Sequence, residues 1–135
     1  HLMFELIWRY RFFYRDLNDL LSRNRKLELH FKLILAHKIK VATQLCEDLR
    51  SEQSLEASDM EVAAMATNMV VVATYWLSYE YVRNPRKYSE QQSMSDALAR
   101  GCYQVLSLIG PYLRNETHLL FRKLSEEYVT KLKND

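Results

Sequence analysis

The chain has 135 residues, of which 48% are hydrophobic and 12% aromatic, and this is long enough for one domain with a buried core. A net charge of +2 at pH 7 is too balanced to predict a nucleic-acid or anionic-membrane surface from composition. Two cysteines give no disulfide framework, which indicates a reducing, cytoplasmic setting, and two glycines and two prolines favour helices.

The first predicted helix runs from Leu2 to about Ser22, and its apolar residues fall on more than one face. Such a helix needs partners on more than one side. The chain opens at His1 inside this apolar pattern with no helix cap, so we expect a fragment of a longer protein. The residues from Ser22 to Lys26 then break or bend the path.

A second helix is predicted from about Lys26 to Arg50 by an apolar stripe at helical spacing. The polar stretch from Ser51 to Ser58 follows it and ends the helix.

The third helix begins with a capping-box pattern, in which Ser58 is followed three residues later by Glu61. It ends near Arg83, because Pro85 keeps Asn84 out of helical geometry.

A fourth helix is predicted from Ser89 or Ser93 to Ile109, where Gly110 and Pro111 stop it. Asn115 can cap a fifth helix that continues to about Lys133. No segment alternates with period two, so we expect an all-α single domain of five to six helices over residues 1–135.

The stretch from Val62 to Tyr79 contains eighteen residues without a charge. Its length approaches that of a membrane span. Thr67, Asn68 and Thr74 inside it, together with its amphipathic neighbours, favour a helix buried in protein and no membrane. Its small residues and its large residues lie on different faces, so we expect two partners: the core of the domain and a second copy of the chain.

Metal and catalytic sites find little support in the residue pattern. His30 and His37 are two helical turns apart and form neither an i,i+4 pair nor a Glu-x-x-His pattern. The chain offers no nucleophile elbow, no glycine-rich phosphate loop and no paired carboxylates on an apolar face. We therefore expect no metal, no cofactor and no enzyme.

Arginines and aromatic residues are mixed between Trp8 and Arg15, a combination that can stack single-stranded nucleic acid. An amphipathic helix whose arginines reach solvent explains it better, because no basic excess accompanies it.

Methionine and aromatic side chains could form the wall of a hydrophobic ligand pocket, although ordinary core packing is the simpler reading of them. The pocket candidates are Phe12, Phe31, Leu35, Met65, Met69, Trp76 and Tyr79.

Three stretches of the sequence carry a family resemblance: FELIWRYRFFYRDLNDLL (4–21), ATNMVVVATYWLSYEYVR (66–83) and GCYQVLSLIGPYL (101–113). They resemble the C-terminal regulatory domain of TetR-like transcriptional repressors over almost the whole chain. The resemblance implies a homodimeric helical domain that senses a small-molecule effector, expected to be hydrophobic. DNA would be bound only through an N-terminal helix-turn-helix domain that is absent from these residues.

The resemblance also implies a four-helix bundle across a two-fold axis, formed by the helices matching Ser58–Arg83 and Ser89–Ile109 and their copies. The effector would lie among the first three helices. The residues expected at the dimer interface are Ala63, Thr67, Val70, Thr74, Leu98, Gly101, Val105 and Leu108. The alternative is a free-standing helical bundle that docks another protein without a ligand.

Overall fold

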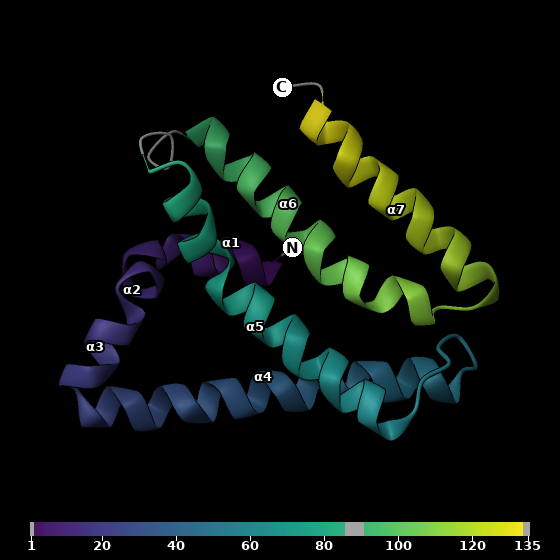
Figure 1. Cartoon of the computed structure of the whole chain (residues 1–135), viewed down its shortest axis with the longest axis horizontal. Helices are drawn as coiled ribbons and strands as arrows, with labels where there is room; N and C mark the ends of the chain where they lie inside the picture. The colour runs from purple at the N-terminus through teal and green to yellow at the C-terminus, as the bar shows by residue number, and fades with distance from the viewer. Residues whose placement is uncertain (1, 86–90, 134–135) are drawn as a thin grey trace.

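A computed structural model describes residues 2–85 and 91–133, which form seven α-helices and one short 3-10 helix (Figure 1). Within these ranges no residues form a strand, and the extended backbone meets only in an isolated bridge between Leu55 and Leu113. The expectation of an all-α chain is confirmed. The helices are α1 (Leu2–Arg9), α2 (Arg11–Arg15), α3 (Leu17–Arg23), α4 (Arg25–Ser51), α5 (Asp59–Arg83), α6 (Gln91–Ile109), η1 (Gly110–Tyr112) and α7 (Asn115–Lys133).

The N-terminal segment is divided into three short helices, so the prediction of one helix from Leu2 to Ser22 is wrong. The chain leaves helical geometry at Tyr10 (φ −107°, ψ 28°) and at Asp16 (φ −103°, ψ 17°). Aspartate is a weak helix former, and both oxygens of Asp16 accept hydrogen bonds from the preceding Arg15. The two bends allow Ile7 and Leu17 to turn inwards together, and both are 2% exposed.

Helix α4 matches its prediction within one residue at each end. Asn24 caps it, since its side-chain oxygen accepts from the backbone N–H of Leu27 at 3.0 Å. The other end closes without a glycine: Gln53 takes the left-handed conformation at φ 57°, and Ser54 N–H donates to Leu49 O at 2.9 Å. This is the hydrogen-bond pattern of a Schellman motif, with glutamine in the position that glycine usually occupies.

The predicted capping box of α5 is confirmed. The Ser58 hydroxyl accepts from Glu61 N–H at 3.3 Å, and Glu61 Oε2 accepts from Ser58 N–H at 2.7 Å. The hydrogen bonds that the Glu61 carboxylate accepts from the Ser58 backbone N–H and from the Ser58 hydroxyl hold the pKa of Glu61 below its usual value. The helix ends at Arg83, and Asn84 is outside helical geometry as predicted (φ −143°, ψ 68°).

Helices α6 and α7 follow the predicted breakers. Of the two proposed starts for α6, Ser89 is outside the described residues and Ser93 is inside the helix, which the structure begins at Gln91. After the turn at Gly110 and Pro111, α7 begins at Asn115, whose φ of 53° is one that asparagine tolerates.

Helix α5 is the centre of the fold: it crosses α4, runs beside α6 and contacts α2, while α7 lies along α6 (Figure 1). Three core clusters lie along its length. The first joins Met65 and Met69 to Cys46 and Ile109, the second joins Ala73 to Leu98 and Cys102, and the third joins Ala66 and Val70 to Ala42. Both cysteines, Cys46 and Cys102, are buried, and neither forms a disulfide.

A buried ion pair joins α5 to α6. Glu80 is 4% exposed, and Arg100 donates to its two carboxylate oxygens at 3.1 and 2.7 Å. One turn away, the Trp76 indole N–H donates to the Ala97 carbonyl at 2.7 Å. These bonds fix the register between the two helices.

The loop between α4 and α5 is tied to the turn between α6 and α7. Glu56 N–H donates to Tyr112 O and Arg114 N–H donates to Ser54 O, both at 2.9 Å. The Arg114 side chain also pairs with Glu56 at 2.7 Å. The ends of α4 and α6 are therefore held at one place.

Helix α5 is long and apolar enough to cross a membrane by length and composition, and 44% of its most apolar window is buried inside the protein. The core helix of a soluble protein meets the same criterion, so the sequence length alone is weak support for a span.

Candidate functional site

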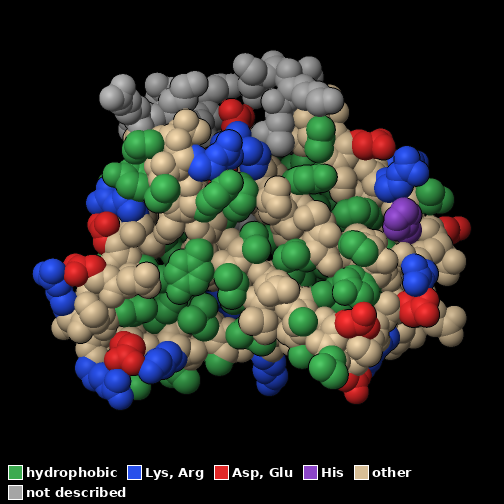
Figure 2. Space-filling view, viewed as in Figure 1, with side chains coloured by type: hydrophobic (Ala, Val, Ile, Leu, Met, Phe, Trp, Pro, Cys, Tyr) green, Lys and Arg blue, Asp and Glu red, His purple; other side chains and the backbone are tan. Residues whose placement is uncertain are grey.

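The surface side of α5 carries an apolar stripe along the whole helix. Val71 is 49% exposed, Val82 77% and Met60 84%, and no charged residue interrupts the stripe from Val62 to Tyr79. Hydrophobic side chains gather across the middle of the face shown in Figure 2, where α5 runs in Figure 1. We call this the outer stripe; its residues are Met60, Ala64, Thr67, Val71, Tyr75, Tyr79 and Val82.

The residues predicted for a dimer interface divide between the surface and the interior. Ala63 and Thr67 are exposed, and Val105 and Leu108 are half-buried. Val70, Thr74, Leu98 and Gly101 are buried inside the protomer and have no surface to offer to a partner.

Along α5 the prediction runs from Thr67 to Val70 and Thr74, which pack inwards in the protomer, whereas the exposed positions continue through Val71 and Tyr75. One residue corresponds to a 100° rotation about the helix axis, which is enough to exchange an exposed position for a buried one. In the uncharged stretch both faces are apolar, so hydrophobicity could not separate them.

A second feature lies inside the protein, between α2, α4 and α5, where Tyr14 contacts both long helices. Its backbone carbonyl accepts from the Ser78 hydroxyl of α5 at 3.2 Å. Its ring lies 6.3 Å from the ring of Phe31 on α4, and Phe13 adds a third ring at 6.0 Å from Phe31. Burial raises the pKa of Tyr14. An aromatic wall therefore separates α2 from α4.

Two polar atoms in this region are buried without a hydrogen-bond partner among the described residues: Lys38 Nζ and Thr74 Oγ1. The Lys38 amine lies 5.6 Å from the centroid of the Tyr14 ring, and burial lowers its pKa. Buried polar groups in folded proteins are nearly always paired, so two such atoms in one region call for a ligand or a water. We call the region around these two side chains and Tyr14 the inner site.

Both atoms can be placed in the inner site from their neighbours on each helix. Thr74 lies one turn after Val70, which belongs to the core cluster on which Leu35 and Ile39 of α4 pack. It lies one turn before Ser78, whose hydroxyl donates to Tyr14 O. Lys38 is between these α4 residues and contacts the Tyr14 ring itself. Lys38 was not predicted as a site residue, because a lysine in an amphipathic helix normally points to solvent.

The structure does not bring the seven predicted pocket residues together. Met65 and Met69 belong to the core cluster with Cys46, and Leu35 packs on the cluster around Ala66. Phe12 and Tyr79 are exposed at 61% and 52%. Trp76 and Tyr79 are neighbours in the C-terminal half of α5, with ring centroids 5.1 Å apart. Phe31 reaches the inner site through its contact with the Tyr14 ring.

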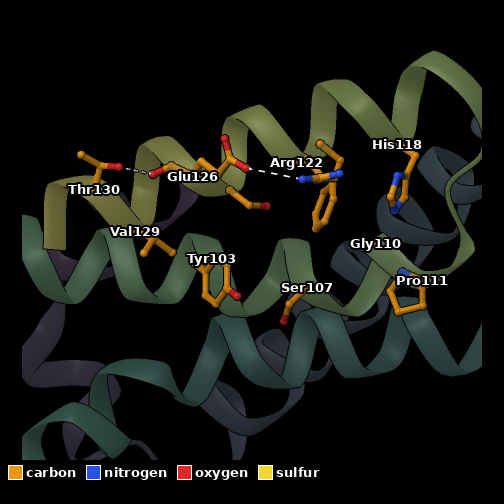
Figure 3. A pocket seen from close by; sticks show the side chains of 11 residues that line it. Tyr103, Ser107, Gly110, Pro111, His118, Arg122, Glu126, Val129 and Thr130 are labelled. Atoms are coloured by element: carbon orange, nitrogen blue, oxygen red, sulfur yellow. Dashed lines mark hydrogen bonds and ion pairs between the residues drawn. The ribbon is translucent and has the colours of Figure 1, made fainter. Parts of the chain in front are cut away.

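A groove of about 600 Å³ runs between α6 and α7 (Figure 3). Tyr103 and Ser107 of α6 face His118, Arg122 and Glu126 of α7 across it. The Arg122–Glu126 ion pair spans 4.0 Å between exposed side chains, which makes it a weak interaction. The lining is mixed, and it shows no group with the buried, unpaired character of Lys38 apart from Ser125 Oγ.

Metal ligation finds no support in the described ranges, where no three His, Cys, Asp or Glu side chains are placed to hold one ion. His30 Nδ1 is instead within 2.8 Å of the Lys26 carbonyl in its own helix.

Comparisons with known proteins agree with this helical architecture. The family model of the TetR bacterial transcriptional repressors matches residues 1–121. The crystal structure of a TetR-family transcriptional regulator from Marinobacter aquaeolei VT8 is similar, with a TM-score of 0.76 and 26% sequence identity. The match covers 93% of this chain and 57% of that regulator's chain. No curated protein sequence matches.

Proposed function

The chain belongs to the TetR family of bacterial transcriptional repressors, and from that premise we propose that it is the effector-sensing and homodimerisation domain of such a regulator. It would couple the binding of a small molecule to the DNA affinity of an N-terminal helix-turn-helix domain outside these residues. Because the chain spans 57% of the length of the similar regulator, these roles of the whole protein remain proposals. We expect a cytoplasmic protein without catalysis of its own.

The outer stripe of α5 is the observation that supports dimerisation. It extends from Met60 to Val82, about 33 Å at 1.5 Å per residue. A long uncharged face on a soluble protein marks an interaction surface. A second copy of the chain is the occupant that fits, because an uncharged stripe meets its own copy about a two-fold axis without like-charge repulsion.

The proposed dimer is a four-helix bundle of α5 and α6 with their copies. Leu108 and Tyr112 lie on the same side of the protein as the outer stripe, because they line a groove together with Met60 and Ala64 of α5. The bundle would therefore use the outer stripe together with the exposed end of α6. The buried residues Val70, Thr74 and Leu98 are not part of it.

The experiment is a measurement of molecular mass in solution by sedimentation equilibrium at micromolar concentration. The wild-type chain is expected to be a dimer, and Val71→Glu is expected to convert it to a monomer by burying like charges at the two-fold axis. Val41→Glu is the matched control: Val41 is 55% exposed on α4, away from the outer stripe, and its substitution should leave the dimer intact.

A wild-type monomer at micromolar concentration would contradict the proposal and favour the free-standing interaction module. So would a dimer that Val41→Glu dissociates and Val71→Glu does not, because the interface would then lie on α4.

Effector sensing rests on the inner site. Any molecule bound there would contact α2, α4 and α5 together, and α5 is also the helix of the proposed dimer interface. To switch DNA binding, the effector must bind one arrangement of the dimer more tightly than the other. Differential affinity of this kind can be measured as a change in the dimer dissociation constant on addition of effector.

A further inference from the structure

Lys38 is oriented opposite to the usual arrangement of a surface lysine. Lys38 as a whole is half-buried, yet its Nζ atom is fully buried. The solvent-exposed part of the residue is therefore its aliphatic stem and backbone. Lysines normally bury the stem and keep the amine in water. A reversed lysine indicates that the amine has a role in the interior.

Among the residues that the structure describes, this amine has no hydrogen-bond partner. The residues one turn away on α4, Ile34 and Ala42, are apolar. Carboxylates on the neighbouring helices already have basic partners: Arg15 for Asp16, Arg100 for Glu80, and Arg25 and Lys32 for Glu28. The Tyr14 ring at 5.6 Å offers only partial compensation, since a cation–π contact is weaker than a charged hydrogen bond.

The surroundings of the amine are apolar and aromatic, with one further polar atom. The Tyr14 ring of α2 lies beside the amine, and the Phe31 ring of α4 lies against Tyr14. On α5, the buried hydroxyl of Thr74 has no hydrogen-bond partner among the described residues. A carboxylate has two oxygens, so one can pair with the amine while the other accepts from the hydroxyl. The remainder of such a ligand would contact hydrocarbon.

We propose that the inner site binds an amphipathic carboxylate, an apolar chain or ring that bears one carboxyl group, with Lys38 pairing the carboxylate and Thr74 donating a hydrogen bond to it. This inference rests on the proposed effector-sensing function and specifies its ligand class. Bound carboxylate would give both orphan groups their missing partners.

The test measures binding of three ten-carbon probes that share one chain and differ in the head group: decanoate, decanol and decylamine. Isothermal titration calorimetry of the full chain is expected to rank decanoate first and decylamine last. Lys38→Met is expected to weaken decanoate binding by about tenfold to a hundredfold, the range for a hydrogen bond to a charged group, and to leave decanol binding within about twofold.

Lys40→Met is the matched control, because Lys40 is exposed on the same helix and its loss changes the net charge equally. It should leave decanoate binding unchanged. Lys38→Arg, which keeps the charge, should retain part of the affinity that Lys38→Met loses, whereas a merely structural lysine would show no such recovery.

Equal affinity for decanoate and decanol, or decanoate binding unchanged by Lys38→Met, would overturn the ligand class and leave effector sensing intact. The same conclusion would follow if decanol alone bound. If none of the three probes bound, this inference would also be overturned. The proposed dimerisation is tested by a different experiment, in which a wild-type monomer in sedimentation equilibrium would contradict it.

Discussion

The two inward sides of α5 differ in how completely their polar atoms are paired. Toward α6, the Trp76 indole donates to Ala97 O, and both oxygens of Glu80 accept from Arg100. Toward α2 and α4, Ser78 pairs with Tyr14 O, but Thr74 Oγ1 and Lys38 Nζ are without partners among the described residues. The same helix therefore has a closed side and an open side.

The contrast indicates that the two sides of α5 have different roles, one in stability and one in ligand binding. A side whose polar groups are all satisfied holds a single arrangement, because any shift leaves a buried group unpaired. A side with orphan groups gives up stability that a ligand can restore. We expect substitutions on the α6 side to lower the stability of the protein, and those at the inner site to alter binding.

The largest effect is expected from Glu80→Ala, which leaves the Arg100 guanidinium without its partner. Removing one member of a buried pair costs about 3 kcal/mol or more of the free energy of unfolding, and Arg100, at 31% exposure, places the loss near the lower end. Urea denaturation measures it. Asp19→Ala, which breaks an exposed pair with Arg23, should cost well under about 1 kcal/mol. Similar losses for the two variants would refute the distinction between buried and exposed pairs.

The packing of α7 against the end of α6 can be tested at Gly110, which lies against Phe121 of α7. A Cβ atom added there would lie 2.6 Å from the Phe121 ring carbons Cε1 and Cζ. Gly110→Ala must displace that ring, so we expect a loss of about 1 to 2 kcal/mol in the free energy of unfolding, measured by urea denaturation. The Gly110→Ala/Phe121→Leu double variant should lose less than the two single variants combined. Strict additivity would show that the contact is not the cause.

On the open side of α5, the substitution Lys38→Met is expected to stabilise the ligand-free protein. Removing a buried amine without a partner should raise the free energy of unfolding by about 1 kcal/mol, whereas Lys40→Met should change it little. Differential scanning calorimetry of both variants without ligand gives the answer. A lower melting temperature for Lys38→Met would mean that the amine is already paired in solution.

The smallest effect is expected at Gln53, in the turn between α4 and α5. Its φ of 57° is costly for any residue with a Cβ atom, so Gln53→Gly should stabilise the protein by about 0.5 kcal/mol after the added freedom of the unfolded chain is subtracted. Gln53→Ala keeps the strain and should give no gain. Equal stabilities of the two variants in urea denaturation would show that the strain is absorbed elsewhere.

The helix boundaries could be predicted where they depend on local chemistry. The capping box at Ser58 and Glu61 and the stop before Pro85 act over three or four residues, so the sequence contains the whole signal. The bends at Tyr10 and Asp16 were missed because they accompany the burial of Ile7 and Leu17, and α1 packs on α5 and α6, which are distant in sequence. Periodicity cannot report such a requirement.

The candidate sites depended on contacts across the fold, and the prediction was weaker there. The uncharged stretch from Val62 to Tyr79 indicated two partners, but its rotation about the helix axis is decided by α4 and α6. Lys38 gave no signal at all, since its neighbours in sequence are those of an ordinary solvent-facing lysine. The burial of its Nζ atom and the Tyr14 ring beside it, both produced by the fold, distinguish it.

The tie between the two turns, in which Glu56 and Arg114 pair although 58 residues separate them, also bears on the order in which the chain folds. Closing so long a loop costs entropy that a few exposed bonds cannot recover alone. The tie should therefore form only after α5 and α6 have packed. Native-state hydrogen exchange would then find the amides of Glu56 and Arg114 opening before those in the middle of α5, through a local opening that leaves the three core clusters intact.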